Sequence, residues 1–176
     1  MIRIVVTTSR HPTPPVRRLA REFASLVYGG IRVNRGSMNE EELFSVAKEY
    51  GASRIVIFSR GRGGNPGRVT FIDTTGDKPL HIPFILWLRG VVFLSRAKRA
   101  ESETPIFSMG ECGGLPEEFS LAMGIPYLGR YTAEDSRSIV VECVARRRLL
   151  AVIKFIEEER EIGVKLLVEK VVQREW

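Results

Sequence analysis

The side chains with the clearest capacity for chemistry are the arginines of the first 35 residues. This segment holds seven arginines and a single acid, Glu22, whereas the remaining 141 residues carry equal numbers of basic and acidic groups. The formal net charge of +6 is therefore confined to the first fifth of the chain. A second stretch without acids, from Tyr50 to Ile72, contains four more arginines. Clustered guanidinium groups are typical of surfaces that bind nucleic-acid phosphates; the simpler interpretation is a solvated, charged helix face.

A phosphate would be held most directly where these arginines meet the start of a helix. Arg17 and Arg21 are one turn apart, so they share a helix face. Arg10 comes just before the same helix, whose first amides and positive dipole end attract anions. Arg174 has neighbours of both charges and is expected to contribute little. We therefore predict side chains that bind nucleic-acid phosphates at Ser9, Arg10, Arg17, Arg18, Arg21, Arg32, Arg35, Arg60, Arg62 and Arg68.

The chain has few residues that are candidates for catalysis or for metal binding. The histidines, His11 and His81, are seventy residues apart, and the cysteines, Cys112 and Cys143, lack metal-ligand spacing. We therefore predict no metal and no cofactor. Core or idle thiols are typical of a reducing compartment, and a disulfide is expected only if the source is a hyperthermophile. Cys112 lies among glycines and would be an accessible nucleophile, but no base lies nearby in sequence, so we predict that the protein is not an enzyme.

A short buried strand over Ile2–Thr7 and a helix that begins at Pro14 position the first arginines. Thr13 is predicted to cap this helix, and Pro14 suits its first position because no backbone donor is lost there. Apolar residues recur at intervals of three and four from Val16 to Val27 and form the buried stripe. The helix arginines fall off this stripe and are expected to face water.

A second helix is predicted between Ser37 and Tyr50. Ser37 and Glu40 fit a capping box, and Tyr50 is expected on the inward face. The continuous apolar run Ile55–Phe58 indicates a strand that is covered on both faces. If this strand runs parallel to Ile2–Thr7, the two arginine-bearing loops leave the same end of the sheet and converge.

Several features allow two interpretations. The glycine-rich loop Ser59–Gly67 leads into a strand and lacks the Gly-Lys-Ser/Thr ending of a nucleotide loop, so a phosphate cradle for RNA and a flexible hairpin are equal alternatives. The turn Arg146–Arg148 fits an RNA-facing role, a solubilising role or contact with Glu157–Glu161. The larger aromatic residues of the second half are interpreted as core rather than as base-stacking platforms; these are Phe84, Trp87, Phe93 and Phe119.

The second half of the chain is less regular than the first. Leu80–Leu94 is long enough for two strands, residues 105–114 have no clear period, Leu115–Met123 is a helix, and residues 124–135 form a loop. The last part of the chain is predicted to form a set of antiparallel strands, and a helix over Arg146–Arg160 is the alternative prediction for part of it. That set is predicted at Ile139–Val144, Leu149–Glu157 and Ile162–Val172. The order of elements predicts an α/β fold, a mixed-sheet α/β sandwich, in a single domain of residues 1–176 with approximate halves 1–78 and 79–176.

The first 75 residues also carry a specific combination of motifs. In order, they are Thr8-Ser9-Arg10, the prolines of Pro12–Pro15, the basic helix Arg17–Arg21, Arg35-Gly36-Ser37, the strand Ile55–Phe58 and the basic loop Ser59–Arg68. This combination resembles the Brix-domain proteins, which act in ribosome assembly. The chain lacks basic extensions and the Gly-Pro-Thr stretch of eukaryotic members, so it resembles a minimal, archaeal-type member. The resemblance implies two similar α/β halves, each like the anticodon-binding domain of some aminoacyl-tRNA synthetases, and rRNA binding without catalysis.

Together, charge and resemblance predict a non-catalytic rRNA-binding factor in ribosome assembly and pre-rRNA processing. The expected partners are rRNA or pre-rRNA and ribosomal or assembly proteins. No apolar run approaches the ~18 residues that span a bilayer, and no secretory signal precedes the first strand, so a cytoplasmic protein without membrane contact is expected. The alternatives are another RNA-binding module, such as a tRNA anticodon binder or a nuclease subunit, and a small enzyme that uses Cys112.

Overall fold

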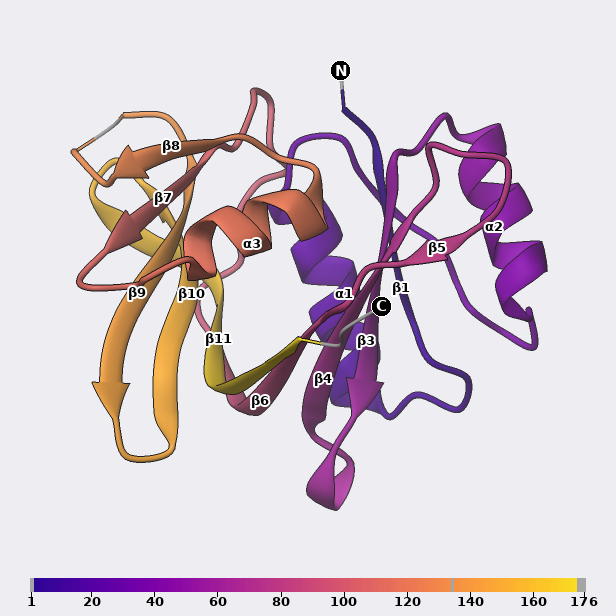
Figure 1. The fold of residues 1–176 in the computed structure, drawn as a ribbon, viewed down its shortest axis with the longest axis horizontal. Helices are drawn as coiled ribbons and strands as arrows, with labels where there is room; N and C mark the ends of the chain where they lie inside the picture. The colour runs from indigo at the N-terminus through magenta and orange to yellow at the C-terminus, as the bar shows by residue number, and fades with distance from the viewer. Residues whose placement is uncertain (1, 134, 174–176) are drawn as a thin grey trace.

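A continuous mixed sheet of eleven strands forms the centre of the computed structural model, which describes residues 2–133 and 135–173 (Figure 1). The helices are α1 (Pro14–Leu26), α2 (Glu40–Glu49) and α3 (Leu115–Met123). The strands are β1 (Ile4–Thr8), β2 (Gly30–Arg32), β3 (Arg54–Arg60), β4 (Pro66–Asp73), β5 (Leu80–His81), β6 (Phe84–Phe93), β7 (Ile106–Met109), β8 (Tyr127–Arg130), β9 (Ser138–Arg146), β10 (Leu149–Glu157) and β11 (Arg160–Gln173). Along the sheet their order is β2-β1-β3-β4-β6-β11-β10-β9-β7-β8, and β5 pairs with β4.

The sheet consists of two sets of strands with the same order from edge to middle. In the first set, β1 pairs in parallel with β2 and β3, and β3 pairs antiparallel with β4. In the second set, β7 pairs in parallel with β8 and β9, and β9 pairs antiparallel with β10. The sets join where β6 pairs antiparallel with β11. The mixed-sheet α/β fold is therefore confirmed, with two similarly ordered parts. The domain limits 1–78 and 79–176 stay a prediction; in the sheet, β6 is grouped with the first set.

The two faces of the sheet are covered differently. Helices α1 and α3 share one face and one core, in which the Phe23 ring lies 5.1 Å from Phe58 and 5.7 Å from Phe155. Helix α2 stands apart from them (Figure 1) and packs on the other face over β1 and β3, where Leu43 and Ala47 are buried. Within the described residues, no helix covers this second face from β6 to β10.

The closing antiparallel set and the two strands within Leu80–Leu94 are confirmed, as is the helix Leu115–Met123. The competing helix over Arg146–Arg160 is wrong, because these residues pair as β9 and β10. The segments interpreted as irregular contain β7 and β8, which have four residues each. Such short parallel strands depend on partners far away in the chain, so they leave little periodic signal in sequence.

The helix starts differ from the predicted caps. Thr13 occupies the N-cap position of α1, but its hydroxyl donates to the carbonyl of Gly64 instead of accepting from the helix. Helix α2 is capped by Asn39, whose Oδ1 accepts from the amide of Glu42 at 2.9 Å, so the predicted capping box of Ser37 and Glu40 is wrong.

Two further observations concern exposure. Tyr50, expected on the inward face of α2, is 43% exposed because α2 ends before it.

None of the helices in the described residues is long and apolar enough to cross a membrane.

Candidate RNA-binding interface

The loops after β1 and β3 lie side by side, as predicted. The two strands are parallel and in register from Ile4↔Arg54 to Thr8↔Phe58. The amide of Ser9 donates to the carbonyl of Phe58 at 3.0 Å, which extends this pairing into the first loop. The Thr13 hydroxyl then ties the start of α1 to Gly64 in the second loop. The Ser-Arg loop and the glycine-rich loop therefore form one end of the fold, toward the bottom of Figure 1.

The glycine-rich loop is a tight connection between antiparallel strands, and it leads into β4 rather than into a helix. A Cβ atom on Gly67 would lie 2.5 Å from the Cα of Gly61, so the two backbone segments approach too closely for side chains. Gly63 and Gly64 have φ angles of 65° and 78°, which L-residues rarely adopt. Arg60 and Arg62 are exposed beside these glycines, which leaves the phosphate-cradle interpretation as a prediction.

Six arginines gather beside α1, and we call them the α1 cluster. They border two cavities, of about 630 Å³ and about 510 Å³, which share Arg18 and Arg21. The members are Arg17, Arg18 and Arg21 from α1, Arg32 from β2, and Arg96 and Arg99 from the segment after β6. The acid in the first cavity, Glu22, is already paired with Arg18 at 2.9 Å. The α1 cluster therefore presents a strong local excess of positive charge.

The pKa of Arg32 reflects this excess of positive charge. Burial, followed by repulsion from Arg21 and Arg17, lowers the pKa of Arg32. Like charges held this close are relieved when an anion lies between them, so the α1 cluster favours a ligand with several negative charges. The sequence prediction did not include Arg96 and Arg99; their signal was the close spacing of three basic residues, Arg96, Lys98 and Arg99.

A second group of predicted residues lies on the other face of the sheet. Ser9, Arg10, Arg35 and Arg68 line a cavity of about 490 Å³ that we call the Arg35 pocket. Arg35 is only 8% exposed, and it donates from Nε to the carbonyl of Met38 at 2.8 Å and from Nη1 to that of Thr8 at 3.2 Å. Burial, then repulsion from Arg10, lowers its pKa. The convergence of Arg10 with the loop after β3 is thus confirmed at Arg68.

The predicted residues therefore fall into two groups rather than one patch. Arg17, Arg18, Arg21 and Arg32 belong to the α1 cluster, on the face that α1 covers. The residues of the Arg35 pocket lie on the face that α2 partly covers, and Arg60 and Arg62 lie on the loop between β3 and β4. Arg174 lies outside the described residues.

Histidine and aromatic residues add two observations. His81 is exposed on the short strand β5, and its Nε2 lies 2.7 Å from Oε2 of Glu40 at the start of α2. Phe84 and Phe119 are buried core residues, as expected. Trp87 is only partly buried and belongs to none of the buried clusters, so its interpretation as a core residue is wrong.

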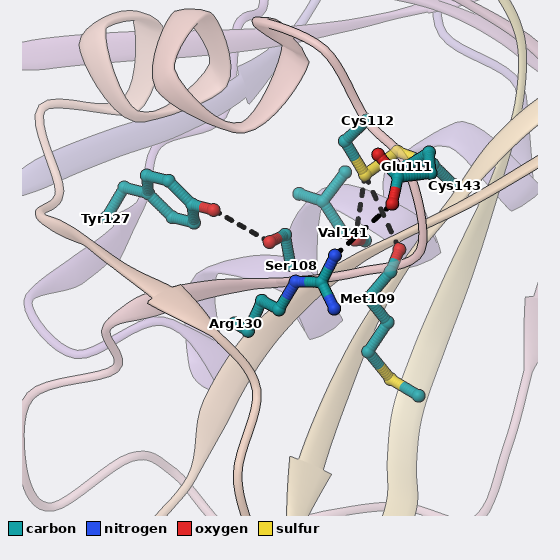
Figure 2. Close-up of a disulfide and its surroundings, with 8 residues drawn as sticks. All are labelled: Ser108, Met109, Glu111, Cys112, Tyr127, Arg130, Val141 and Cys143. Atoms are coloured by element: carbon teal, nitrogen blue, oxygen red, sulfur yellow. Dashed lines mark hydrogen bonds and ion pairs between the residues drawn. A yellow bond between two sulfur atoms is a disulfide. The ribbon is translucent and has the colours of Figure 1, made fainter.

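Cys112 and Cys143 form a disulfide with an S–S distance of 1.95 Å (Figure 2), which corrects the expectation of idle thiols. Parallel pairing of β7 with β9 brings these residues together although they are 31 positions apart. A disulfide sulfur has no thiolate to act as a nucleophile, so the structure does not support an enzyme that uses Cys112. In residues 2–133 and 135–173, no group of three or more His, Cys, Asp or Glu side chains could hold a metal ion.

Comparisons with known proteins were made for sequence and for structure. No family model matches the chain. A "Probable Brix domain-containing ribosomal biogenesis protein" of Aeropyrum pernix is 36% identical over 95 residues, which is 53% of this chain and 51% of that protein. The U3 small nucleolar ribonucleoprotein protein IMP4 of Saccharomyces cerevisiae is 34% identical over 61 residues, 35% of this chain and 21% of that protein. The matches thus span about half or less of these relatives' length.

Two solved structures are similar to this chain over almost its whole length. The crystal structure of a probable ribosomal biogenesis protein from Aeropyrum pernix K1 superimposes with a TM-score of 0.79 and 26% identity, and it covers 97% of both chains. That of an archaeal Imp4-like protein superimposes with a TM-score of 0.69 at 22% identity, over 97% of this chain and 99% of the other. At 22% identity, the similarity to the Imp4-like protein is evidence only for a shared fold.

Proposed function

We propose that this chain is a Brix-domain protein, that it is a non-catalytic RNA-binding factor of ribosome assembly and pre-rRNA processing, and that its ligand is rRNA or pre-rRNA. The names of the relatives refer to ribosomal biogenesis and to a small nucleolar ribonucleoprotein, an RNA–protein particle. This supports an intracellular site of action, with RNA and assembly proteins as partners. Nothing in the comparisons favours a tRNA anticodon binder or a nuclease subunit.

The α1 cluster is the observation that carries this proposal. It combines six arginines from three segments with one acid, and that acid is already paired. Guanidinium groups bind phosphate oxygens in bidentate geometry, and every phosphate that they neutralise releases counterions from the RNA. A polyanion with regularly spaced phosphates satisfies such a cluster better than a single small anion does.

The test measures affinity for a labelled rRNA fragment by anisotropy at several salt concentrations. Contact with four to six phosphates predicts a slope of log affinity against log salt of roughly −3 to −5. Replacing Arg17 and Arg21 with alanine should weaken binding and make the slope shallower by about two. Both side chains are exposed and lie off the buried stripe of α1, so the melting temperature should change little.

A matched control removes the same charge elsewhere. Arg130 is 77% exposed on the edge strand β8 and lies 3.3 Å from Glu111 (Figure 2), while Arg160 follows two exposed glutamates. Arg130→Ala with Arg160→Ala should leave affinity and slope close to wild type. A flat salt response of the native protein, or equal losses in the two double variants, would contradict the proposal.

A further inference from the structure

The open face of the sheet carries a row of polar and aromatic side chains that are in register across four strands. Ser59 on β3 pairs with Arg68 on β4, Arg68 pairs with Trp87 on β6, and Trp87 pairs with Lys170 on β11. Directly paired residues of neighbouring strands point to the same side of a sheet. The row Ser59–Arg68–Trp87–Lys170, which we call the Trp87 row, therefore lies on the face that α2 covers only at its far end.

The indole of Trp87 lies between two cations. The guanidinium carbon of Arg68 is 5.8 Å from the centre of the ring, and Nζ of Lys170 is 5.3 Å from it. Trp87 is partly buried, and Lys170 is exposed. An aromatic ring with cations on the two neighbouring strands is suited to a ligand that is flat, aromatic and attached to negative groups.

The Trp87 row continues into the Arg35 pocket, because Arg68 belongs to both. Ile57 and Ile85 give the pocket an apolar part of its lining, and Arg10 and Arg35 line it too. Its one acid, Glu40, is paired with His81 at 2.7 Å. An aromatic ring, apolar side chains and cations are thus present together on one face of the sheet.

On this basis, and resting on the function proposed above, we propose that the open face binds single-stranded RNA. One base stacks on Trp87, and the flanking phosphates contact Arg68 and Lys170 and, toward the pocket, Arg10. The positive charge of the row and pocket favours a polyanion over an acceptor peptide without charge. Duplex RNA keeps its bases paired and stacked on each other, so it has no base to place on this ring.

Intrinsic fluorescence of Trp87 tests the contact directly. The chain has two tryptophans, and the second, Trp176, lies outside the described residues. The variant Trp176→Phe leaves Trp87 as the single reporter. Titration with an eight-nucleotide oligoadenylate should quench its emission, because a base stacked on the indole quenches the excited ring by direct contact. An abasic ribose-phosphate oligomer of the same length should bind through its phosphates without this quenching.

Affinity provides the second measurement. Trp87→Leu should weaken oligoadenylate binding about 5- to 100-fold, the range for one stacked base, while the matched Trp87→Phe should retain most of it. Neither change should alter the effect of the Arg17/Arg21 double variant on the rRNA fragment. Melting temperatures of both variants identify any loss caused by unfolding, and the Trp176→Phe titration does not depend on them.

The outcomes separate this inference from the proposed function. If the rRNA fragment binds through the α1 cluster but bound oligoadenylate leaves Trp87 emission unchanged, the inference is overturned, and the open face remains for a protein partner. If neither RNA binds at low salt, both proposals fail. Quenching by oligoadenylate but not by the abasic oligomer, together with the loss in Trp87→Leu, supports the inference.

Discussion

Single residues of the interface divide into those that hold the backbone and those that face outward. Arg35 is buried and donates to two carbonyls, so it fixes the turn before α2 to the end of β1. Arg17 also donates to a carbonyl, that of Pro12 at 3.0 Å, but it remains exposed. Arg21 is exposed on the same helix face. We therefore expect loss of Arg35 to affect folding first and loss of Arg21 to affect RNA binding first.

Thr13 gives a prediction at this scale. Thr13→Val removes the hydroxyl that donates to Gly64 and places a methyl group there instead. The carbonyl of Gly64 then lacks this donor, which should lower the free energy of unfolding by about 1 kcal/mol. Because the hydroxyl joins the two arginine-bearing loops, RNA affinity should fall as well. Urea unfolding and anisotropy measure the two effects.

Thr13→Ser is the control for this prediction, because it keeps the hydroxyl. It should retain most of the stability and affinity of the native protein. A Thr13→Val variant with unchanged stability and unchanged affinity would show that the bond to Gly64 does not hold the loops together.

At the scale of elements, the second half depends on tertiary pairing more than the first. Helix α1 has a continuous apolar stripe with Leu19 and Phe23 fully buried, and it could be predicted from that stripe. The short strands β7 and β8 form only because α3 connects them and β9 pairs beside β7. The disulfide fixes the loop that leads into α3 to strand β9 (Figure 2).

Removal of this disulfide should destabilise the protein markedly. For two cysteines 31 positions apart, restriction of the unfolded chain predicts a loss of about 3–4 kcal/mol in the Cys112→Ser, Cys143→Ser double variant. Denaturant unfolding with and without a thiol reductant measures it. The reductant should bring the native protein to the stability of the double variant and should not affect that variant. A native protein whose stability is insensitive to complete reduction would contradict the prediction.

At the scale of the whole molecule, the two sets of strands share one core. The ring of Phe23 in α1 lies 5.7 Å from that of Phe155 in β10, and the ring of Phe71 in β4 lies 6.3 Å from that of Phe119 in α3. The long antiparallel pairing of β6 with β11 continues the sheet across the same boundary. Separating the sets would expose aromatic side chains of both to water.

We therefore expect the chain to unfold in a single transition. Urea unfolding followed by far-ultraviolet circular dichroism and by tryptophan fluorescence should give coincident curves. A fragment of residues 1–93, which ends with β6, should lack a cooperative transition because Phe23 loses its contact with Phe155 and Phe71 loses its contact with Phe119. Two separate transitions in the full chain, or a cooperatively folded fragment, would instead show that the parts are independent domains.

Features that depend on neighbours along the chain could be predicted from the sequence. Helix α1 has a periodic apolar stripe, β3 has a continuous apolar run, and the closing strands mix β-branched and charged residues. The arginine content of the first 35 residues is a matter of composition. The parallel pairing of β1 with β3 was the condition for the two arginine-bearing segments to converge; the structure shows this pairing and places Arg10 and Arg68 in one pocket.

Features that depend on register and on distant partners become visible only in the folded chain. Cys112 and Cys143 pair because β7 and β9 bring their Cα atoms to 5.2 Å, a distance that spacing in sequence cannot reveal. Trp87 belongs to an open row rather than to the core because strand register, not hydrophobicity, decides which face a side chain occupies. Arg32 and Arg35 are close in sequence, yet Arg32 lies in the α1 cluster and Arg35 in the pocket on the other face of the sheet. Successive side chains of an extended segment point to opposite faces, so closeness in sequence does not place two arginines on the same face.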